Sequence, residues 1–408
     1  MRVLFISDVY FPRVNGVSTS IRTFRNDLGA AGIETVLVAP AYPAAVAAGE
    51  SAASAGGDAE PGIVRVVAGG VPGDPEDRRM HWRALTARLR ELHTQPFDLV
   101  HIHTPFVAHY AGVRFARAHR IPVVATYHTF FEEYLHHYVP LLPRALGRVF
   151  ARHFTRSQCA QLQAVVVPSE PMRALLQEYG VRTRLQVVPT GLPADRFVPG
   201  DGARFRAAHG IAPDRPLLLY VGRVAHEKNI EFLLQSFVEV LRARPDALLA
   251  IAGEGPAREG LRERAVALGI AQAVVFIGYL DRAQGLADCY AAGDVFVFAS
   301  RTETQGLVLL EALAQGRPVV STAYLGTASI LQPGCGAHIA PEKPEVFATA
   351  VLNILEDHVR AARLSAQARS YAQSWASTQM AQRLAQLYRE VCHSGIKSDT
   401  ALATAALR

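Results

Sequence analysis

Short runs of consecutive apolar residues alternate with longer segments of helical periodicity along nearly the whole chain. Continuous apolar runs are typical of strands in a parallel sheet whose two faces are covered by helices. The pattern predicts an α/β fold with strands in the first half at residues 2–7, 34–40, 63–68, 98–103, 122–128, 164–169 and 185–190. Further strands are predicted in the second half at residues 217–223, 247–255, 273–279, 295–300 and 318–323.

The alternation pauses at the proline- and glycine-containing segment 189–200 and then restarts. A chain of 408 residues is longer than one hydrophobic core usually supports. We therefore predict two Rossmann-like domains, at 1–188 and 201–370, with a linker at 189–200 and their parallel sheets facing each other across a cleft. Residues 371–392 are expected to form a helix that packs back on the first domain, residues 393–408 a flexible tail, and residues 41–62 a loop.

Composition and charge restrict the class of protein. No apolar run approaches the roughly 20 residues of a membrane span, and Asp8 comes too early for a signal-peptide core. The four cysteines are scattered without metal-ligand spacing, which favours a reducing cytoplasm and argues against a structural zinc ion. The net charge is +6, and we expect no nucleic-acid partner.

Arg223 and Lys228 follow the strand predicted at 217–223, at the edge of the sheet where ligands bind. Lys228 is the only lysine before residue 343, whereas arginine supplies nearly all the other positive charge. A planar guanidinium and a compact ammonium group together suit the binding of a diphosphate. Two solvated charges on a loop are the structural alternative, and the position after a buried strand favours the diphosphate.

The segment from Ser300 to Val320 combines an almost entirely apolar helix with two glutamates. Glu311 lies within the helix, where an unpaired buried carboxylate is costly, and Glu303 precedes its start. The residues Thr304, Gln305, Gly306 and Leu307 lie at the amino terminus of this helix, which favours an anion. As an alternative, Glu311 is a purely structural carboxylate, although so apolar a helix offers it few internal partners.

The motifs GRVAHEKN, GEGP, FIGYL and ETQGLVLLEALAQGRPVV, in this order, resemble the donor half of the family-4 retaining glycosyltransferases, which are GT-B enzymes. The resemblance covers about residues 1–390. It implies that Glu303 meets the donor sugar, that Glu311 meets the ribose, and that Arg223 and Lys228 hold the diphosphate and support catalysis. It places Glu254, Gly278 and the helix start 304–307 in the same donor site.

In the first half, the resemblance implies roles for Gly16, close to the donor phosphates, and for His128, beside the donor sugar. Asn15 and Gly16 also read as an ordinary turn and helix cap, and a lone histidine is more often structural. His101 and His103 are expected to satisfy local hydrogen bonds. Ser169 and Glu170 fit a family element and a helix cap equally well.

The chain has no DxD triplet, so we expect no metal and no cofactor beyond the nucleotide-sugar co-substrate. Arg223, Lys228 and helix amides would then stabilise the leaving group. The resemblance implies retention at the anomeric carbon, and no residue pattern identifies a carboxylate nucleophile.

The segment 139–161 predicts a basic amphipathic helix, since arginines recur every fourth residue and no acidic residue occurs between positions 134 and 169. A second cluster precedes it, and the residues predicted to contact an anionic membrane are Arg78, Arg79, Trp82, Arg144, Arg148, Arg152 and Arg156. The structural alternative for each cluster is a solvated arginine face.

The segments VPGDPEDR and TYHTFFEEYLHHYVP resemble diacylglycerol glucosyltransferases and, more distantly, phosphatidylinositol mannosyltransferases. The sequence therefore predicts a hexosyltransferase using UDP-glucose or GDP-mannose and a lipid acceptor, peripheral on the inner face of the cytoplasmic membrane. The alternatives are a soluble sugar or polysaccharide acceptor, a catalytically silent GT-B scaffold, and a GT-B epimerase.

Overall fold

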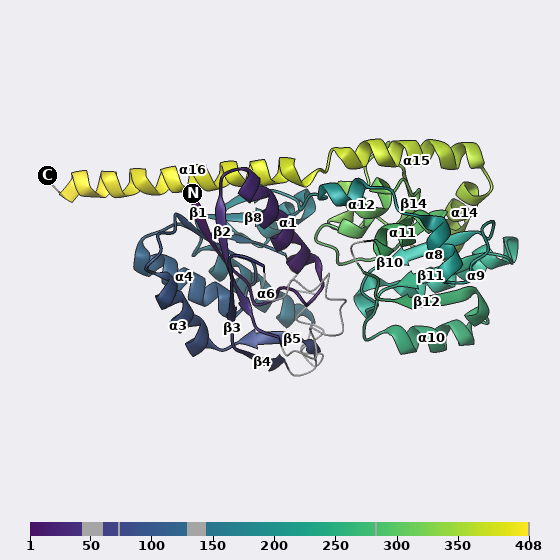
Figure 1. Cartoon of the computed structure of the whole chain (residues 1–408), viewed down its shortest axis with the longest axis horizontal. Coiled ribbons are helices and arrows are strands. Elements are labelled where there is room, and N and C mark those ends of the chain that lie inside the picture. The colour runs from purple at the N-terminus through teal and green to yellow at the C-terminus, as the bar shows by residue number, and fades with distance from the viewer. Residues whose placement is uncertain (43–59, 72–73, 129–143, 282–283, 407–408) are drawn as a thin grey trace. The chain divides into compact units, whose positions relative to one another are not determined.

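The computed structural model describes residues 1–42, 60–71, 74–128, 144–281 and 284–406, with the backbone alone at 74–77, 144–145 and 395–406 (Figure 1). The chain divides into two compact units, the first of Met1–Gly191 with Ser377–Arg408 and the second of Leu192–Ala376. Most of the loop predicted at 41–62 lies outside the described residues, which resume at residue 60.

The first unit contains a seven-stranded parallel sheet in the order β3-β2-β1-β6-β7-β8-β9. Its strands are β1 (Arg2–Ile6), β2 (Glu34–Pro40), β3 (Ile63–Val66), β6 (Leu99–Ile102), β7 (Val123–Thr126), β8 (Ala164–Val167) and β9 (Arg184–Val187). Leu4 and Ile6 of β1 belong to one buried cluster and Val3 and Phe5 to another. Because both faces of the sheet are covered, its strands are continuously apolar, and the seven strands predicted in the first half are confirmed.

Helices of the first unit cover the two faces unequally. One face carries α3 (Trp82–Leu92), α4 (Val107–His119), α7 (Glu170–Glu178) and the end of α6 (Arg144–Cys159). The other carries α1 (Gly16–Ala30) and α16 (Ser377–Ala406). An antiparallel hairpin of β4 (Ala68–Val71) and β5 (Asp74–Met80) adds a small separate sheet that the apolar pattern does not predict.

The last helix, α16, belongs to the first unit although it ends the chain. Its Leu384 and Tyr388 are fully buried in the same cluster as Phe24 of α1. The sequence predicts such a helix at 371–392 and a flexible tail after it. In the structure the helix begins at Ser377 and runs to Ala406, and residues 371–373 belong to α15 (His358–Gln373).

The second unit contains a six-stranded parallel sheet in the order β12-β11-β10-β13-β14-β15. Its strands are β10 (Leu217–Val221), β11 (Leu248–Ala252), β12 (Val274–Gly278), β13 (Val295–Phe298), β14 (Val319–Ser321) and β15 (Ala337–Ile339). The five strands predicted in this half are confirmed. The edge strand β15 is missed because its three residues include a histidine and form no apolar run.

The helices of the second unit, besides α15, are α8 (Gly202–Ala208), α9 (Ile230–Ala243), α10 (Arg258–Ala267), α11 (Gly285–Ala292), α12 (Leu307–Ala314), α13 (Thr327–Ile330) and α14 (Pro344–Leu355). Single 3₁₀ turns occur at η1 (Ala194–Phe197), η2 (His226–Lys228) and η3 (Ala271–Ala273). The predicted linker 189–200 belongs to this unit from Leu192 onward. The backbone N–H of Leu192 donates a hydrogen bond to the Trp375 carbonyl oxygen at 2.7 Å.

The strand order reverses once in each sheet, between β1 and β6 and between β10 and β13. Ligands of open parallel sheets bind at the carboxyl ends of strands beside such a reversal. Ligand-binding residues are therefore expected in the loops that follow these four strands. Among the described helices, none has both the length and the apolar character needed to cross a membrane.

Candidate active site

The loops after β10 and β13 meet through an ion pair. The Lys228 Nζ donates a hydrogen bond to Glu303 Oε1 at 2.6 Å, and both side chains are about four-fifths buried. Asn229, which adopts a left-handed backbone conformation with φ 55°, donates from its side-chain amide to the Ala299 carbonyl oxygen at 3.3 Å. Two motifs 75 residues apart in sequence thus form one cluster at the strand-order reversal.

Arg223 belongs to the same loop as Lys228. Its carbonyl oxygen accepts a hydrogen bond from the Tyr220 hydroxyl at 3.0 Å, and its guanidinium lies 4.0 Å from a carboxylate oxygen of Glu227. The side chain keeps 37% of its surface exposed. A partly exposed guanidinium and an ammonium group therefore stand on one short loop, as a diphosphate site requires.

The GEGP motif packs the loop after β11 against the loop after β10. A Cβ at Gly253 would lie 2.0 Å from the Gly222 carbonyl oxygen, and one at Gly255 would lie 2.3 Å from the Val224 carbonyl oxygen. Both positions therefore require glycine, and part of the motif's role is structural. Glu254, between the two glycines, forms an ion pair with Arg258. Its Oε1 also lies close to Gly278, since a Cβ added at Gly278 would be 3.0 Å from this oxygen.

The helix start predicted at 304–307 is formed by α12, which begins at Leu307. Gly306 caps it with φ 100°, a conformation that glycine adopts without strain. The preceding loop is held by Gly326, whose N–H donates to the Glu303 carbonyl oxygen at 2.8 Å and whose Cβ would lie 2.1 Å from the Thr304 carbonyl oxygen. The first backbone N–H groups of a helix lack intrahelical acceptors, so this end attracts an anion. Gln305, at 5% exposure, is buried beneath the loop.

Glu311 lies in the second turn of α12 and is 5% exposed. The Tyr290 hydroxyl of α11 donates a hydrogen bond to Glu311 Oε2 at 2.9 Å. The sequence predicts few partners for Glu311 within its own helix, and the hydrogen bond that the structure shows comes from a different helix. Tyr290 is 1% exposed and holds Glu311 in a defined orientation.

In the first unit, His128 follows β7 and contacts a second histidine. Its Nε2 lies 3.3 Å from His103 Nδ1, and the two rings stack with centroids 5.6 Å apart. Burial lowers the pKa of His128 to about 3 and that of His103 well below its ordinary value. Both imidazoles are therefore neutral near pH 7, so each can form hydrogen bonds there but carries no positive charge.

His101 is structural, as expected. Its Nδ1 lies 2.5 Å from the Tyr388 hydroxyl of α16 and its Nε2 lies 2.7 Å from Thr126 Oγ1. Asp8, after β1, accepts hydrogen bonds from Thr104 Oγ1 and the backbone N–H of Ala108 at the start of α4. Burial raises the pKa of the Asp8 carboxyl to about 6.

We expect the folded state of the first unit to lose stability in acid because of these buried histidines. The pKa values of His101, His103, His109 and His128 are all lowered by burial, so below about pH 6.5 the unfolded chain binds protons that the folded chain does not. Stability therefore falls as the pH falls from 6.5 toward 4, and the raised pKa of Asp8 opposes only part of this loss. Urea unfolding between pH 7.5 and 4.5 measures the slope, and a flat profile between pH 6.5 and 5 would contradict the assignment.

Gly16 begins α1, and the structure shows the turn and cap that the sequence allows. Asn15 Oδ1 accepts a hydrogen bond from the Ser18 N–H at 2.8 Å. A Cβ at Gly16 would meet no heavy atom within 4 Å, so packing within the described residues does not require glycine there. Gly16 and His128 lie in the first unit, whereas the other predicted donor-site residues lie in the second.

The predicted membrane-contact residues lie on exposed elements of the first unit, except that the side chain of Arg144 lies outside the described residues. On α6, Arg148, Arg152 and Arg156 are exposed, and the Arg152 guanidinium lies 5.1 Å from the Tyr179 ring centroid. Apolar neighbours on the same helix are exposed as well, with Leu146 at 56%, Val149 at 64% and Phe150 at 51%. In the second cluster Trp82 is 42% exposed, Arg79 is exposed and Arg78 is half-buried.

Several site residues escape sequence reasoning, and they share one property. Each of them contacts a residue of another element, so no spacing in the local sequence indicates it. They are Asn229, Gly326, Tyr290 and Asp8. Among the residues that the structure describes, no three His, Cys, Asp or Glu side chains gather in a way that could hold a metal ion.

Comparison with known proteins matches each half of the chain to a family model. Residues 14–196 match the model described as Glycosyltransferase Family 4, and residues 201–371 match the model described as Glycosyl transferases group 1. These two spans cover most of the two α/β units and leave out β1, the end of α15 and α16.

The chain is 32% identical over 332 residues to the alpha-monoglucosyldiacylglycerol synthase of Streptococcus pneumoniae, covering 79% of this chain and 71% of that protein. It is 27% identical over 377 residues to the GDP-mannose-dependent alpha-(1-6)-phosphatidylinositol dimannoside mannosyltransferase of Mycobacterium tuberculosis, covering 92% and 93%. Its fold is similar to that of sucrose-phosphate synthase from Thermosynechococcus elongatus, with a TM-score of 0.78, 22% identity and coverage of 96% and 99%. The predicted GT-B fold class is thereby confirmed.

Proposed function

The chain belongs to the family-4 glycosyltransferases, and we propose that it moves a hexose from a nucleotide diphosphate sugar to a lipid acceptor at a membrane surface. The observation that carries the donor half of this proposal is the Lys228–Glu303 ion pair beside the start of α12. It places a cation and a carboxylate beside a helix amino terminus, which matches a ligand with an anionic end and a hydroxyl-rich end.

In the proposed donor complex the Lys228 ammonium group leaves its ion pair with Glu303 and binds the diphosphate instead. Lys228, Arg223 and the first N–H groups of α12 neutralise the diphosphate, while Glu303 accepts hydrogen bonds from hydroxyls of the sugar. Glu311, held by Tyr290, accepts hydrogen bonds from the ribose. We also assign Gly16 of the first unit to the donor phosphates, as the family resemblance implies.

The proposed transfer proceeds with retention and needs no metal. The acceptor hydroxyl attacks the anomeric carbon from the side of the departing phosphate, and its proton passes to that phosphate as the glycosidic bond forms. The cations that bind the diphosphate stabilise the charge that grows on it, and His128 contributes a neutral hydrogen bond near the sugar. No carboxylate is assigned as a nucleophile, so no covalent glycosyl-enzyme is included.

The lipid acceptor is supported by α6 and by the names of two relatives. On α6 three exposed arginines lie on the same helix as three exposed apolar side chains, which suits a helix lying at an anionic membrane surface. The relatives from S. pneumoniae and M. tuberculosis are named for a glucosyldiacylglycerol and a phosphatidylinositol mannoside. We infer a peripheral position on the inner face of the cytoplasmic membrane.

Transfer assays test the proposal directly. The protein is incubated with radiolabelled UDP-glucose or GDP-mannose and vesicles of phosphatidylglycerol and diacylglycerol, with and without EDTA. We expect a labelled glycolipid in both conditions, since the cations of the site replace a metal. Transfer only to a soluble sugar would support the alternative acceptor, and the absence of transfer and donor hydrolysis would support a silent scaffold. Turnover of the donor without any acceptor would support an epimerase.

Co-sedimentation tests the membrane contact separately. The double variant Arg148→Gln/Arg152→Gln is expected to lower binding to anionic vesicles about thirtyfold, because each juxtamembrane arginine contributes about 1 kcal/mol near the surface. Arg242→Gln/Arg262→Gln in the second unit is the matched control, since both arginines are exposed and lie outside the first unit. Equal binding of both variants, or binding insensitive to salt, would contradict the proposal.

A further inference from the structure

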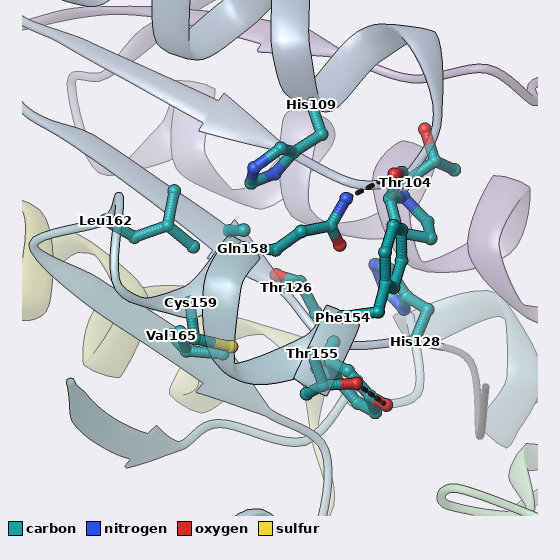
Figure 2. A pocket seen from close by; sticks show the side chains of 13 residues that line it. Thr104, His109, Thr126, His128, Phe154, Thr155, Gln158, Cys159, Leu162 and Val165 are labelled. Carbon is teal, nitrogen blue, oxygen red and sulfur yellow. Dashed lines mark hydrogen bonds between the residues drawn. The ribbon is translucent and has the colours of Figure 1, made fainter. Parts of the chain in front are cut away.

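A small cavity lies inside the first unit, beneath α6 and beside the start of α4. Its volume is about 40 Å³. A single water needs roughly 10–15 Å³ of such space, so the cavity has room for a few heavy atoms. Its walls are mainly apolar, and Figure 2 shows Leu162, Cys159 and Val165 on one side and Phe154 and His128 on the other.

One polar atom in this cavity lacks a partner. His109 on α4 is 2% exposed, and its Nε2 has no hydrogen-bond partner among the described residues. Figure 2 shows its ring directed into the cavity, next to the Gln158 side chain. Gln158 is already engaged, since its Nε2 donates to the Pro105 carbonyl oxygen at 2.6 Å. A buried imidazole nitrogen without a partner is costly to the fold and is a common sign of an absent ligand.

Apolar side chains of α6 connect the wall of the cavity with the protein surface. Phe154, which lines the cavity, stacks on Phe150 with ring centroids 6.0 Å apart. Phe150 is 51% exposed, and its exposed neighbours Leu146 and Val149 extend the apolar surface toward the start of the helix. One apolar path therefore leads from the face of α6 that we assign to the membrane to a cavity lined by His128.

We propose that this cavity binds the ester-bearing end of one acyl chain of the acceptor lipid. This inference rests on the proposed function and specifies how its acceptor is held. The His109 Nε2–H donates a hydrogen bond to the ester carbonyl oxygen, and the first methylenes contact Leu162 and Val165. The rest of the chain leaves past Phe154 and Phe150.

The alternatives to an acyl ester fit the site less well. A sugar would need several polar partners, whereas the walls offer mainly apolar surface and one unpaired nitrogen. An anion would need a cation, and among the residues that the structure describes no arginine or lysine lines the cavity. A group with one hydrogen-bond acceptor followed by methylenes matches this combination of surfaces.

Variants of His109 test the proposal with 1,2-dioctanoylglycerol as acceptor. His109→Leu is expected to raise the KM for this acceptor about tenfold while leaving kcat and the donor KM nearly unchanged, because one buried hydrogen bond is lost. His109→Gln, which keeps an N–H donor, is expected to restore the KM to within about threefold. His119→Leu, on the exposed end of the same helix, is the control with no expected change.

Photo-cross-linking adds a readout that does not depend on turnover. A dioctanoylglycerol that carries a diazirine next to one ester is expected to label residues between 154 and 165, and unlabelled dioctanoylglycerol should compete. Labelling only elsewhere, or an unchanged KM in His109→Leu, would overturn this inference while lipid glycosylation by the wild type still supports the proposed function. If the wild type glycosylates only soluble acceptors, both proposals fail.

Discussion

Replacing Lys228 by alanine is expected to lower kcat for hexose transfer about a thousandfold, with a smaller effect on the KM for the donor. Removing a single preorganised group that stabilises developing charge typically costs a factor of about 10²–10³. In the free protein the same ammonium group pairs with Glu303 at 2.6 Å, so the variant also leaves a mostly buried carboxylate without its cation. Single-turnover kinetics with saturating donor measures the chemical step directly.

The matched control is Lys343→Ala, which removes an exposed lysine from the same unit and is expected to change kcat less than twofold. A structural role for Lys228 would give a different pattern from a catalytic one. If the ion pair only stabilises the unit, Lys228→Ala lowers the free energy of unfolding by about 3 kcal/mol and leaves kcat within threefold of the wild type. That outcome would contradict the proposed role in transfer.

Glu303→Gln completes this comparison. The amide keeps the shape and one hydrogen-bond acceptor but loses the charge that holds Lys228 in the free protein. We expect transfer to slow about a hundredfold while nucleotide binding changes little, because Glu303 is assigned to the sugar. A double-mutant cycle with Lys228→Ala then measures how strongly the two side chains act together.

Glu311→Gln is expected to weaken binding of the nucleoside diphosphate by a factor of about 10–100. Hydrogen bonds to a charged group contribute about 1.5–3 kcal/mol, and the variant removes the charge without changing the size of the side chain. Isothermal titration with UDP and GDP measures the effect without any acceptor. If Glu303→Gln and Glu311→Gln both leave the transfer rate and the nucleotide affinity unchanged, the role of Glu311 is purely structural.

Tyr290→Phe separates orientation of Glu311 from contact with the ligand. Phenylalanine preserves the buried ring but removes the hydroxyl that donates to Glu311 at 2.9 Å. We expect the affinity for the nucleoside diphosphate to fall about tenfold, less than for Glu311→Gln when measured under the same conditions. Tyr371→Phe, a partly buried tyrosine of α15 in the same unit, is the control with no expected change in affinity.

The sequence determined the class of fold because its information is local. Strands covered on both faces are apolar without interruption, so all strands of the two parallel sheets except β15 can be predicted from the sequence, and the donor-side motifs follow several of them. β15 and the β4–β5 hairpin escape this reasoning because they are short or contain glycine and charged residues. The basic stripe of α6 is equally local, since it follows from the helical period alone.

The contacts that form the candidate site depend on strand order and on packing between elements. β10 and β13 are neighbours in the sheet although β11 and β12 lie between them in sequence, and this adjacency brings Lys228 to Glu303. Tyr290 reaches Glu311 from another helix, and the buried His109 Nε2 has no hydrogen-bond partner among the described residues. The sequence by itself determined which chemical groups the chain carries. Only the tertiary structure decided which of them meet, because side chains distant in sequence become neighbours when the sheet and its helices pack.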